Sequence, residues 1–162
     1  MFRWLQPNLI LDSVHEMTPE LLQQHAIRSL LLDVDCTLKR YRAIEIPLDV
    51  VQWIEMMQGA GIGLCILSNG RTHRIRPIAE QIRVPFIAPA MKPTPFGCWS
   101  AINMLKFDPK TTAIVGDQVF ADILAGKFAH IFTILVTPIH PEEEHWYTRM
   151  KRPLEKWVLQ TT

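Results

Sequence analysis

The sequence lacks the features that mark disulfide-rich, membrane-spanning or strongly charged proteins. Only three of its 162 residues are cysteines, Cys36, Cys65 and Cys98, and they form neither a CxxC pair nor a zinc-binding spacing. No run of about twenty apolar residues occurs, so no segment is predicted to span a bilayer. The formal net charge is +1, and we therefore expect no nucleic-acid partner. Together these absences favour a cytoplasmic protein with reduced thiols.

The N-terminal segment also lacks the pattern of a signal peptide, because Pro7 and Asp12 interrupt its apolar residues. Its three apolar residues beside Arg3 allow two interpretations, contact with a membrane surface or packing on the domain; they are Phe2, Trp4 and Leu5. No internal repeat, low-complexity tract or linker divides the chain, and a hydrophobic content of 48% suffices for one core. We expect residues 1–162 to form a single domain, and the sequence leaves its oligomeric state open.

What the sequence does contain is an alternation of apolar and helical segments. Continuous apolar character predicts buried parallel strands at 29–34, 62–67, 85–90, 112–116 and 131–136. Helical spacing and end signals predict helices at 47–61, 71–83, 93–107 and 118–128, and an earlier helix is expected after Thr18 and Pro19. The pattern predicts an α/β fold with three layers, a doubly wound, parallel, five-stranded sheet whose ligands gather at the carboxyl ends of the strands.

Polar residues follow these strands. They are Asp33 and Asp35 after the first strand, Ser68 and Asn69 after the second, Lys92 after the third and Asp117 after the fourth. Alone, Ser68 or Asn69 is typical of a helix cap and Lys92 of a solvated surface, but their shared placement favours one functional site. Carboxylates such as Asp33 and Asp117, at neighbouring strand ends, provide the hard oxygens that Mg²⁺ prefers.

These residues stand in four ordered motifs, DVDCT, LSN, KP and GDQVFAD, between residues 31 and 122. The set resembles the motifs of the haloacid dehalogenase (HAD) superfamily of phosphotransferases. The resemblance implies a phosphatase in which Asp33 is the nucleophile that forms an aspartyl-phosphate. It implies that Asp35 is the acid/base, with a pKa nearer working pH than that of a free carboxyl.

The same resemblance implies the other ligands of the site. Mg²⁺ would be held by Asp33, Asp117 and the backbone carbonyl of Asp35. The phosphoryl group would be bound by Ser68, Asn69 and Lys92, together with Thr37, which also fixes its loop by hydrogen bonding. Asp122 would orient a metal-bound water or Lys92.

The spacing of the motifs leaves no room for a cap domain, because 32 residues separate Asp35 from Ser68 and 22 separate Asn69 from Lys92. The uncapped layout is similar to that of the YqeG-like subgroup, whose better understood relatives dephosphorylate phosphatidylglycerophosphate. This similarity implies a phospholipid-biosynthetic enzyme that contacts the membrane peripherally. Six basic residues near the motifs suit an anionic substrate or lipid surface, or else are solvated faces: Lys39, Arg40, Arg42, Arg71, Arg74 and Arg76.

Several alternatives stay open. The substrate could instead be a soluble phosphometabolite, a nucleotide or a phosphoprotein, and a catalytically silent scaffold with this fold is the non-enzyme alternative. A receiver domain is disfavoured, because its phosphorylated aspartate follows a later strand and its lysine follows the last one. The segment from His140 to His145 fits the first turn of a helix better than a metal site. Cys36 replaces the family's usual Asn, either as a harmless substitution or as an oxidation-sensitive thiol.

Overall fold

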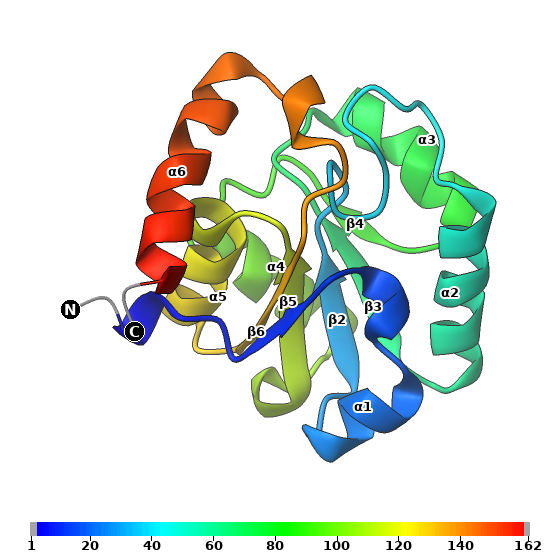
Figure 1. Cartoon of the computed structure of the whole chain (residues 1–162). Helices are drawn as coiled ribbons and strands as arrows, with labels where there is room; N and C mark the ends of the chain where they lie inside the picture. Colours follow the sequence, from blue (N-terminus) through cyan, green and yellow to red (C-terminus); the bar gives the residue numbers. More distant parts are fainter. Residues whose placement is uncertain (1–2, 161–162) are drawn as a thin grey trace.

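The computed structural model describes residues 3–160, so the expected contact of Phe2 lies outside the described residues (Figure 1). Its centre is one parallel sheet with the strand order β1-β6-β5-β2-β3-β4. The strands are β1 (Leu9–Leu11), β2 (Ser29–Leu32), β3 (Gly63–Leu67), β4 (Phe86–Ile87), β5 (Thr112–Gly116) and β6 (Phe132–Val136). The expected doubly wound sheet is confirmed, because from β2 the chain builds outward through β3 to β4 and then adds β5 and β6 on the other side of β2.

The sheet has six strands where the sequence predicted five. The additional strand, β1, runs parallel to β6 at the edge of the sheet, with Leu9 opposite Ile134. Three residues are too few for a periodic signal, and pairing with β6 is what fixes their extended backbone. At the other edge β4 is shorter than the expected 85–90, with only Phe86 and Ile87 in the ladder.

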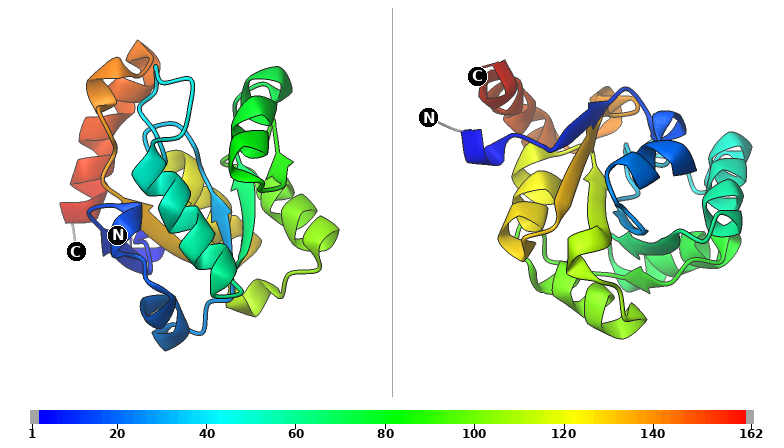
Figure 2. Two further views of the ribbon diagram at one scale, coloured as in Figure 1. Left: turned by 90° about the vertical axis from the view of Figure 1, so that its right-hand side faces the viewer. Right: turned by 90° about the horizontal axis from the view of Figure 1, so that it is seen from below.

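Helices cover both faces of the sheet and complete the three layers (Figures 1 and 2). On one face, α2 (Leu48–Gly59) and α3 (Thr72–Ile82) bury residues such as Ile54 and Ile75 against Leu30 and Leu32. On the other face, α4 (Phe96–Leu105) and α5 (Leu124–Ala129) pack around Leu31. Successive residues of β2 thus point to opposite layers, which accounts for its unbroken apolar sequence.

The short helix α1 (Pro19–Gln24) has the cap that the sequence predicted. The Thr18 hydroxyl accepts a hydrogen bond from the amide of Leu21 at 3.2 Å, and Pro19 occupies the first helical position. The segments that join β2 to β3 and β3 to β4 contain α2 and α3 respectively, and no inserted domain lies within them. The expected absence of a cap at these two points is therefore confirmed.

The C-terminal third differs most from the expectation. The helix expected at 118–128 is a π-helical turn, η4 (Val119–Ile123), followed by α5. Pro141 opens only a 3₁₀ turn (Pro141–Glu143), and the longest helix, α6 (Trp146–Gln160), begins after it. Val158 of α6 packs with Leu5 and Ile123, which places the helix beside η4. Among the described residues, no helix is long and apolar enough to cross a bilayer.

Candidate active site

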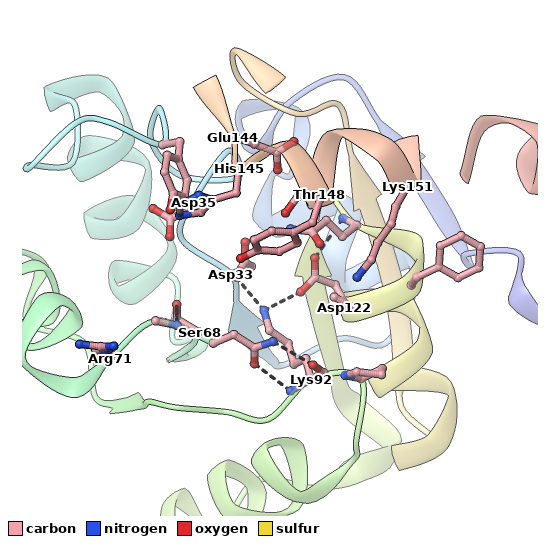
Figure 3. Close-up of a pocket in the computed structure, with 18 of the residues that line it drawn as sticks. Asp33, Asp35, Ser68, Arg71, Lys92, Asp122, Glu144, His145, Thr148 and Lys151 are labelled. Atoms are coloured by element: carbon pink, nitrogen blue, oxygen red, sulfur yellow. Dashed lines mark hydrogen bonds and ion pairs between the residues drawn. The ribbon is translucent and has the colours of Figure 1, made fainter. Parts of the chain in front are cut away.

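A cavity of about 580 Å³ opens at the carboxyl edge of the sheet, where β2 and β5 are neighbours (Figure 3). This is the topological switch point of the sheet, where the chain has built outward in both directions. Most of the predicted residues line the cavity: Asp33, Asp35, Ser68, Asn69, Lys92 and Asp122. Asp117 and Thr37 are buried beside this group, and the Thr37 hydroxyl contacts the carboxylates of both Asp33 and Asp117. The fold therefore brings together all the predicted residues.

Lys92 joins two of the acids. Its Nζ donates hydrogen bonds of 2.6 Å to Asp33 Oδ1 and to Asp122 Oδ1. Burial lowers the pKa of Lys92, but the two carboxylates outweigh burial and raise it above its ordinary value, so the ammonium stays charged. Asp122 reaches this position because Gly116 has no side chain; a Cβ there would lie 2.1 Å from the Asp122 carboxyl carbon.

Asp33 and Asp117 are held close together by Thr37. The Thr37 hydroxyl lies 3.3 Å from Asp33 Oδ2 and 3.1 Å from Asp117 Oδ1, and it has one proton to share between them. Burial raises the pKa of Asp33 to about 6, with Lys92 opposing this shift and Asp122 adding to it. Burial and the charge of Asp33 also raise the pKa of Asp117 well above its ordinary value. The group thus holds more negative charge than its neighbours neutralise.

This crowding fits a divalent cation. One carboxylate oxygen from each of Asp33, Asp117 and Asp122 lies within 4.8 Å of the others, and all three residues are buried. Carboxylate oxygens in such a group suit hard cations such as Mg²⁺. The carboxylate of Asp35 points elsewhere, toward Lys39 and Arg74. Only its backbone carbonyl therefore remains available for the expected metal contact.

Arg152, from α6, makes contacts with the candidate active site that the sequence did not predict. Its guanidinium donates to the Asp117 backbone carbonyl at 2.6 Å and also to the Asp117 carboxylate. It further contacts Glu144 at 2.8 Å and Glu155 at 3.3 Å. Burial lowers the pKa of Arg152, but Asp117 and Glu144 outweigh burial and raise it above its ordinary value. The sequence contained no signal for this role, because Arg152 follows no predicted strand and belongs to none of the four motifs.

Asp35 has the opposite environment to Asp33. Lys39 Nζ donates to Asp35 Oδ1 at 2.8 Å, and both terminal nitrogens of Arg74 donate to the same carboxylate. Burial raises the pKa of Asp35, but these hydrogen bonds outweigh it, so the pKa lies below its ordinary value. The expectation of a pKa nearer working pH is therefore wrong for this state, because two cations stabilise one carboxylate. The i, i+4 spacing of Asp35 and Lys39 was the only sequence signal for these pairs.

Ser68 and Asn69 lie in the loop before α3, four and three residues ahead of its first residue, Thr72. The Ser68 hydroxyl accepts a hydrogen bond from the Gly70 amide at 3.1 Å. Asn69 exchanges two hydrogen bonds of 2.8 Å with the backbone of Lys92. The Asn69 side chain therefore ties the loop after β3 to the segment that carries Lys92.

The six basic residues do not form one free patch. Lys39 is buried and Arg40 pairs with Glu143, whereas Arg76 stacks over the ring of Phe86 at 5.5 Å. Arg71 and Arg74 line the cavity and present positive charge at its entrance. The electrostatic bias of the site is thus narrower than the sequence suggested.

Cys36 adopts a left-handed conformation, with φ of 62°. Asn fits this region better than most residues, which accounts for the family's usual choice there. The thiol is fully buried, and burial raises its pKa, with Asp117 and Glu144 adding to the shift. A buried, protonated thiol is unreactive, which favours a harmless substitution over an oxidation-sensitive site. In the segment from His140 to His145, His140 and Glu142 form an exposed pair.

Comparisons with known proteins agree with this geometry. A curated relative, "Probable phosphatase YqeG" of Bacillus subtilis (strain 168), is 27% identical over 157 residues, which is 97% of this chain and 91% of the relative. The cobalt-bound deoxy-D-mannose-octulosonate 8-phosphate phosphatase of Haemophilus influenzae has a similar fold, with a TM-score of 0.55 at 16% identity, covering 85% of this chain and 91% of the other.

A second solved structure is the 3-deoxy-D-manno-octulosonate 8-phosphate phosphatase of Moraxella catarrhalis in complex with magnesium, phosphate and its sugar. It has a TM-score of 0.51 at 16% identity and covers 62% of this chain and 64% of the other. At this identity the two structures support the fold alone. The family model of haloacid dehalogenase-like hydrolases matches residues 3–130, most of the chain and all four motifs. The chain therefore belongs to the haloacid dehalogenase-like hydrolases.

Proposed function

We propose that this hydrolase is a Mg²⁺-dependent phosphomonoesterase that works, as one domain, through an aspartyl-phosphate on Asp33. The observation that carries the proposal is the position of Lys92, which is hydrogen-bonded to both Asp33 and Asp122 at the wall of an open cavity. A buried ammonium beside a carboxylate nucleophile provides positive charge where a phosphoryl group must bind. The relative from Bacillus subtilis is likewise named a probable phosphatase.

The reaction has two steps on this chain's residues. The Asp33 carboxylate attacks phosphorus, the ester P–O bond breaks, and the leaving alkoxide takes a proton from Asp35. Asp35 then accepts a proton from water as that water attacks phosphorus, and the bond between phosphorus and Asp33 breaks. Lys92, the Ser68 hydroxyl and the loop fixed by Asn69 hold the phosphoryl oxygens, while Thr37 positions the carboxylates.

Asp35 must hold a proton for the first step, and its ion pairs oppose this. A substrate phosphate that binds Arg74 at the cavity entrance would compete with Asp35 for that guanidinium. Weakening this pair removes one of the contacts that lower the pKa of Asp35. We therefore propose that substrate binding itself prepares Asp35 to act as the acid.

Mg²⁺ would be held by Asp33, Asp117 and the backbone carbonyl of Asp35, and when bound it would supply positive charge that stabilises the phosphoryl oxygens. Asp122 would not bind the metal but would hold Lys92 toward Asp33 through its hydrogen bond with the ammonium. The buried carboxylates of Asp33 and Asp117, which have oxygens within 4.8 Å of each other, support this assignment. The magnesium and phosphate in the Moraxella catarrhalis phosphatase are consistent with it.

For the substrate we propose phosphatidylglycerophosphate, hydrolysed at the cytoplasmic face of the membrane. Three features support a large, anionic substrate of this kind. No cap closes the cavity at the two points where HAD enzymes carry one, Arg71 and Arg74 line its entrance, and the motifs resemble the YqeG-like subgroup. A soluble phosphate ester remains the rival outcome of the test.

Substitution of Asp33 tests the mechanism. Asp33→Asn should lower Mg²⁺-dependent phosphate release by about 10⁵-fold, the scale seen when a covalent nucleophile is removed. Mass spectrometry of the acid-quenched wild type should detect one added phosphoryl group on Asp33. The exposed Asp12→Asn is the matched control and should retain full activity. Retained turnover by Asp33→Asn with an unchanged circular dichroism spectrum would exclude the proposed mechanism.

Comparison of turnover on different substrates tests the proposal that the substrate is phosphatidylglycerophosphate. Phosphatidylglycerophosphate in detergent micelles is compared with sugar phosphates, nucleotides and a phosphopeptide, with Mg²⁺ and then with EDTA. We expect the highest kcat/KM for the lipid and no turnover in EDTA. A soluble ester with the highest kcat/KM would replace the lipid proposal and leave the phosphatase mechanism intact.

A further inference from the structure

The outer face of α6 carries a continuous row of exposed apolar side chains. Each is between 51% and 70% exposed, and together we call them the α6 stripe: Trp146, Tyr147, Met150, Leu154 and Trp157. At 3.6 residues per turn these five positions fall within an arc of about 100° on the helix. The opposite side of α6 faces the protein through Arg152 and Glu155, and Val158, at the edge of the stripe, is also buried. Five large apolar side chains on one exposed arc of a single helix point to a surface that binds something.

The charges beside the α6 stripe all have one sign. Arg149, Lys151 and Lys156 are exposed, and Glu155, the only acidic residue between Trp146 and Gln160, is buried. Glu155 accepts hydrogen bonds from the Phe120 amide and from Arg152, so its negative charge is paired inside the protein and does not face the solvent beside the stripe. Arg149 and Lys156 lie on one side of the stripe and Lys151 on the other, by the same helical geometry. An apolar stripe between basic flanks is typical of helices that lie in the interface of an anionic bilayer.

The stripe is continuous with the candidate active site. Tyr147 belongs to the stripe and also lines the cavity. Thr148 and Lys151 of the same helix line it as well (Figure 3). From the inner side of α6, Arg152 donates to the carboxylate and carbonyl of Asp117. One helix thus presents its apolar face outward and holds a candidate metal ligand inward. A lipid layer against the stripe would place headgroups at the entrance of the cavity.

We propose that the α6 stripe and its basic flanks bind the surface of an anionic phospholipid bilayer and so position the cavity over lipid headgroups. The choice of a lipid substrate in this inference rests on the proposed function, whereas the binding surface rests on α6 alone. A second copy of the chain is a poorer occupant, because pairing two stripes would bring their basic flanks together. An anionic bilayer matches both the apolar residues and the flanking charges.

Vesicle cosedimentation of the full chain tests the surface without any phosphatidylglycerophosphate. The vesicles are phosphatidylcholine, with or without phosphatidylglycerol. The wild type should bind the mixed vesicles and bind pure phosphatidylcholine weakly, and added salt should weaken binding because it screens the flanks. The double variant Met150→Ser with Leu154→Ser should bind about tenfold more weakly, since two apolar side chains are lost from the interface.

Two matched variants separate the contributions. Leu48→Ser with Met56→Ser removes two exposed apolar side chains from α2, on the opposite side of the molecule (Figure 1), and should bind as the wild type does. Arg149→Gln with Lys156→Gln should weaken binding to the mixed vesicles and reduce its salt dependence. The exposed pair Lys106→Gln and Lys110→Gln is the charge control and should leave binding unchanged.

The outcomes distinguish this inference from the proposed function. Equal vesicle binding by the stripe variant and the wild type, or no binding by either, would overturn the role of α6. If the stripe variant differed from the wild type only in its molar mass by light scattering, the stripe would bind a second copy of the chain. That result would also overturn the membrane-binding role of α6. Hydrolysis of phosphatidylglycerophosphate in micelles reports on the active site independently. If the wild type bound vesicles but did not hydrolyse phosphatidylglycerophosphate, the proposed substrate would be overturned and the proposed binding surface would stand.

Discussion

Two acidic groups meet at the carboxyl edge of the sheet, and they are balanced in opposite ways. In the inner group, Asp33, Asp117 and Asp122 are buried and face Lys92 and Arg152. Arg152 also contacts Glu144 and Glu155, so the carboxylates outnumber the cations. At the rim, the single carboxylate of Asp35 faces two cations, Lys39 and Arg74.

The difference indicates what each group attracts. Burial raises the pKa of Asp33 to about 6, and Asp122 adds to the shift although Lys92 opposes it, so a proton competes for the carboxylate when no other cation is bound. Lys39 and Arg74 hold the pKa of Asp35 below its ordinary value in spite of burial, so the rim has positive charge to spare. An inner group short of positive charge favours a divalent cation, and a rim with excess positive charge favours the phosphate of a substrate.

Removing Arg152 tests the inner group and should have the largest effect. Arg152→Gln leaves Asp117, Glu144 and Glu155 without their shared cation. In EDTA we expect the free energy of unfolding in urea to fall by about 3 kcal/mol, the usual cost of breaking a buried ion pair. In Mg²⁺ the loss should be smaller, because a bound cation compensates the charge of Asp117.

The matched control is Arg149→Gln, an exposed substitution on the same helix. It should change the free energy of unfolding by less than about 0.5 kcal/mol, with or without Mg²⁺. If Arg152→Gln lowered the free energy of unfolding equally in EDTA and in Mg²⁺, the guanidinium and the metal would not share Asp117.

The pH dependence of the inner group gives a second, smaller effect. The pKa of Asp33 rises from 3.8 to about 6 on folding in the metal-free protein, so its contribution to stability is complete below pH 3.8 and is lost as pH rises through about 6. In EDTA this contribution makes the protein less stable at pH 7 than at pH 5. Mg²⁺ needs the ionised carboxylate, so its affinity should fall about tenfold for each pH unit below 6.

Isothermal titration calorimetry between pH 5 and 7.5 measures this competition. Asp33→Asn should show weaker Mg²⁺ binding and a flatter pH dependence, because the competing proton is gone. A wild-type affinity that stays constant from pH 5 to 7.5 would contradict the raised pKa of Asp33.

The same contrast explains how far the sequence alone could lead. Strands such as Thr112–Gly116 were predictable because buried parallel strands have continuous apolar sequences, and the residues that follow them meet at one edge. The Lys92 contacts with Asp33 and Asp122 follow from that convergence. The three-residue strand β1 gave no such signal, since its backbone depends on pairing with β6.

The partners of the acids were harder to predict than the acids. Arg152 reaches Asp117 from α6, 35 residues away, and only the packing of that helix beside η4 brings them together. The pKa of Asp35 was predicted in the wrong direction for the same reason. Lys39 and Arg74 were interpreted as surface charges, whereas Lys39 is buried and both bind Asp35. Tertiary contacts decided the pairs of Arg152 and Arg74, and only the i, i+4 spacing of Asp35 and Lys39 carried a sequence signal.

Weakening the rim gives the smallest expected effect and the sharpest test of Asp35. Arg74→Gln removes two of the hydrogen bonds that stabilise the ionised carboxylate, so the pKa of Asp35 should rise. The alkaline limb of the kcat/KM profile, where Asp35 loses the proton that the first step needs, should therefore move to higher pH. KM should rise about threefold, since the Arg74 side chain is partly exposed. The control is Arg76→Gln on the same helix, which loses its contact with Phe86 and should keep the wild-type profile. If Arg74→Gln left the profile in place and changed only KM, Arg74 would bind substrate without controlling the proton on Asp35.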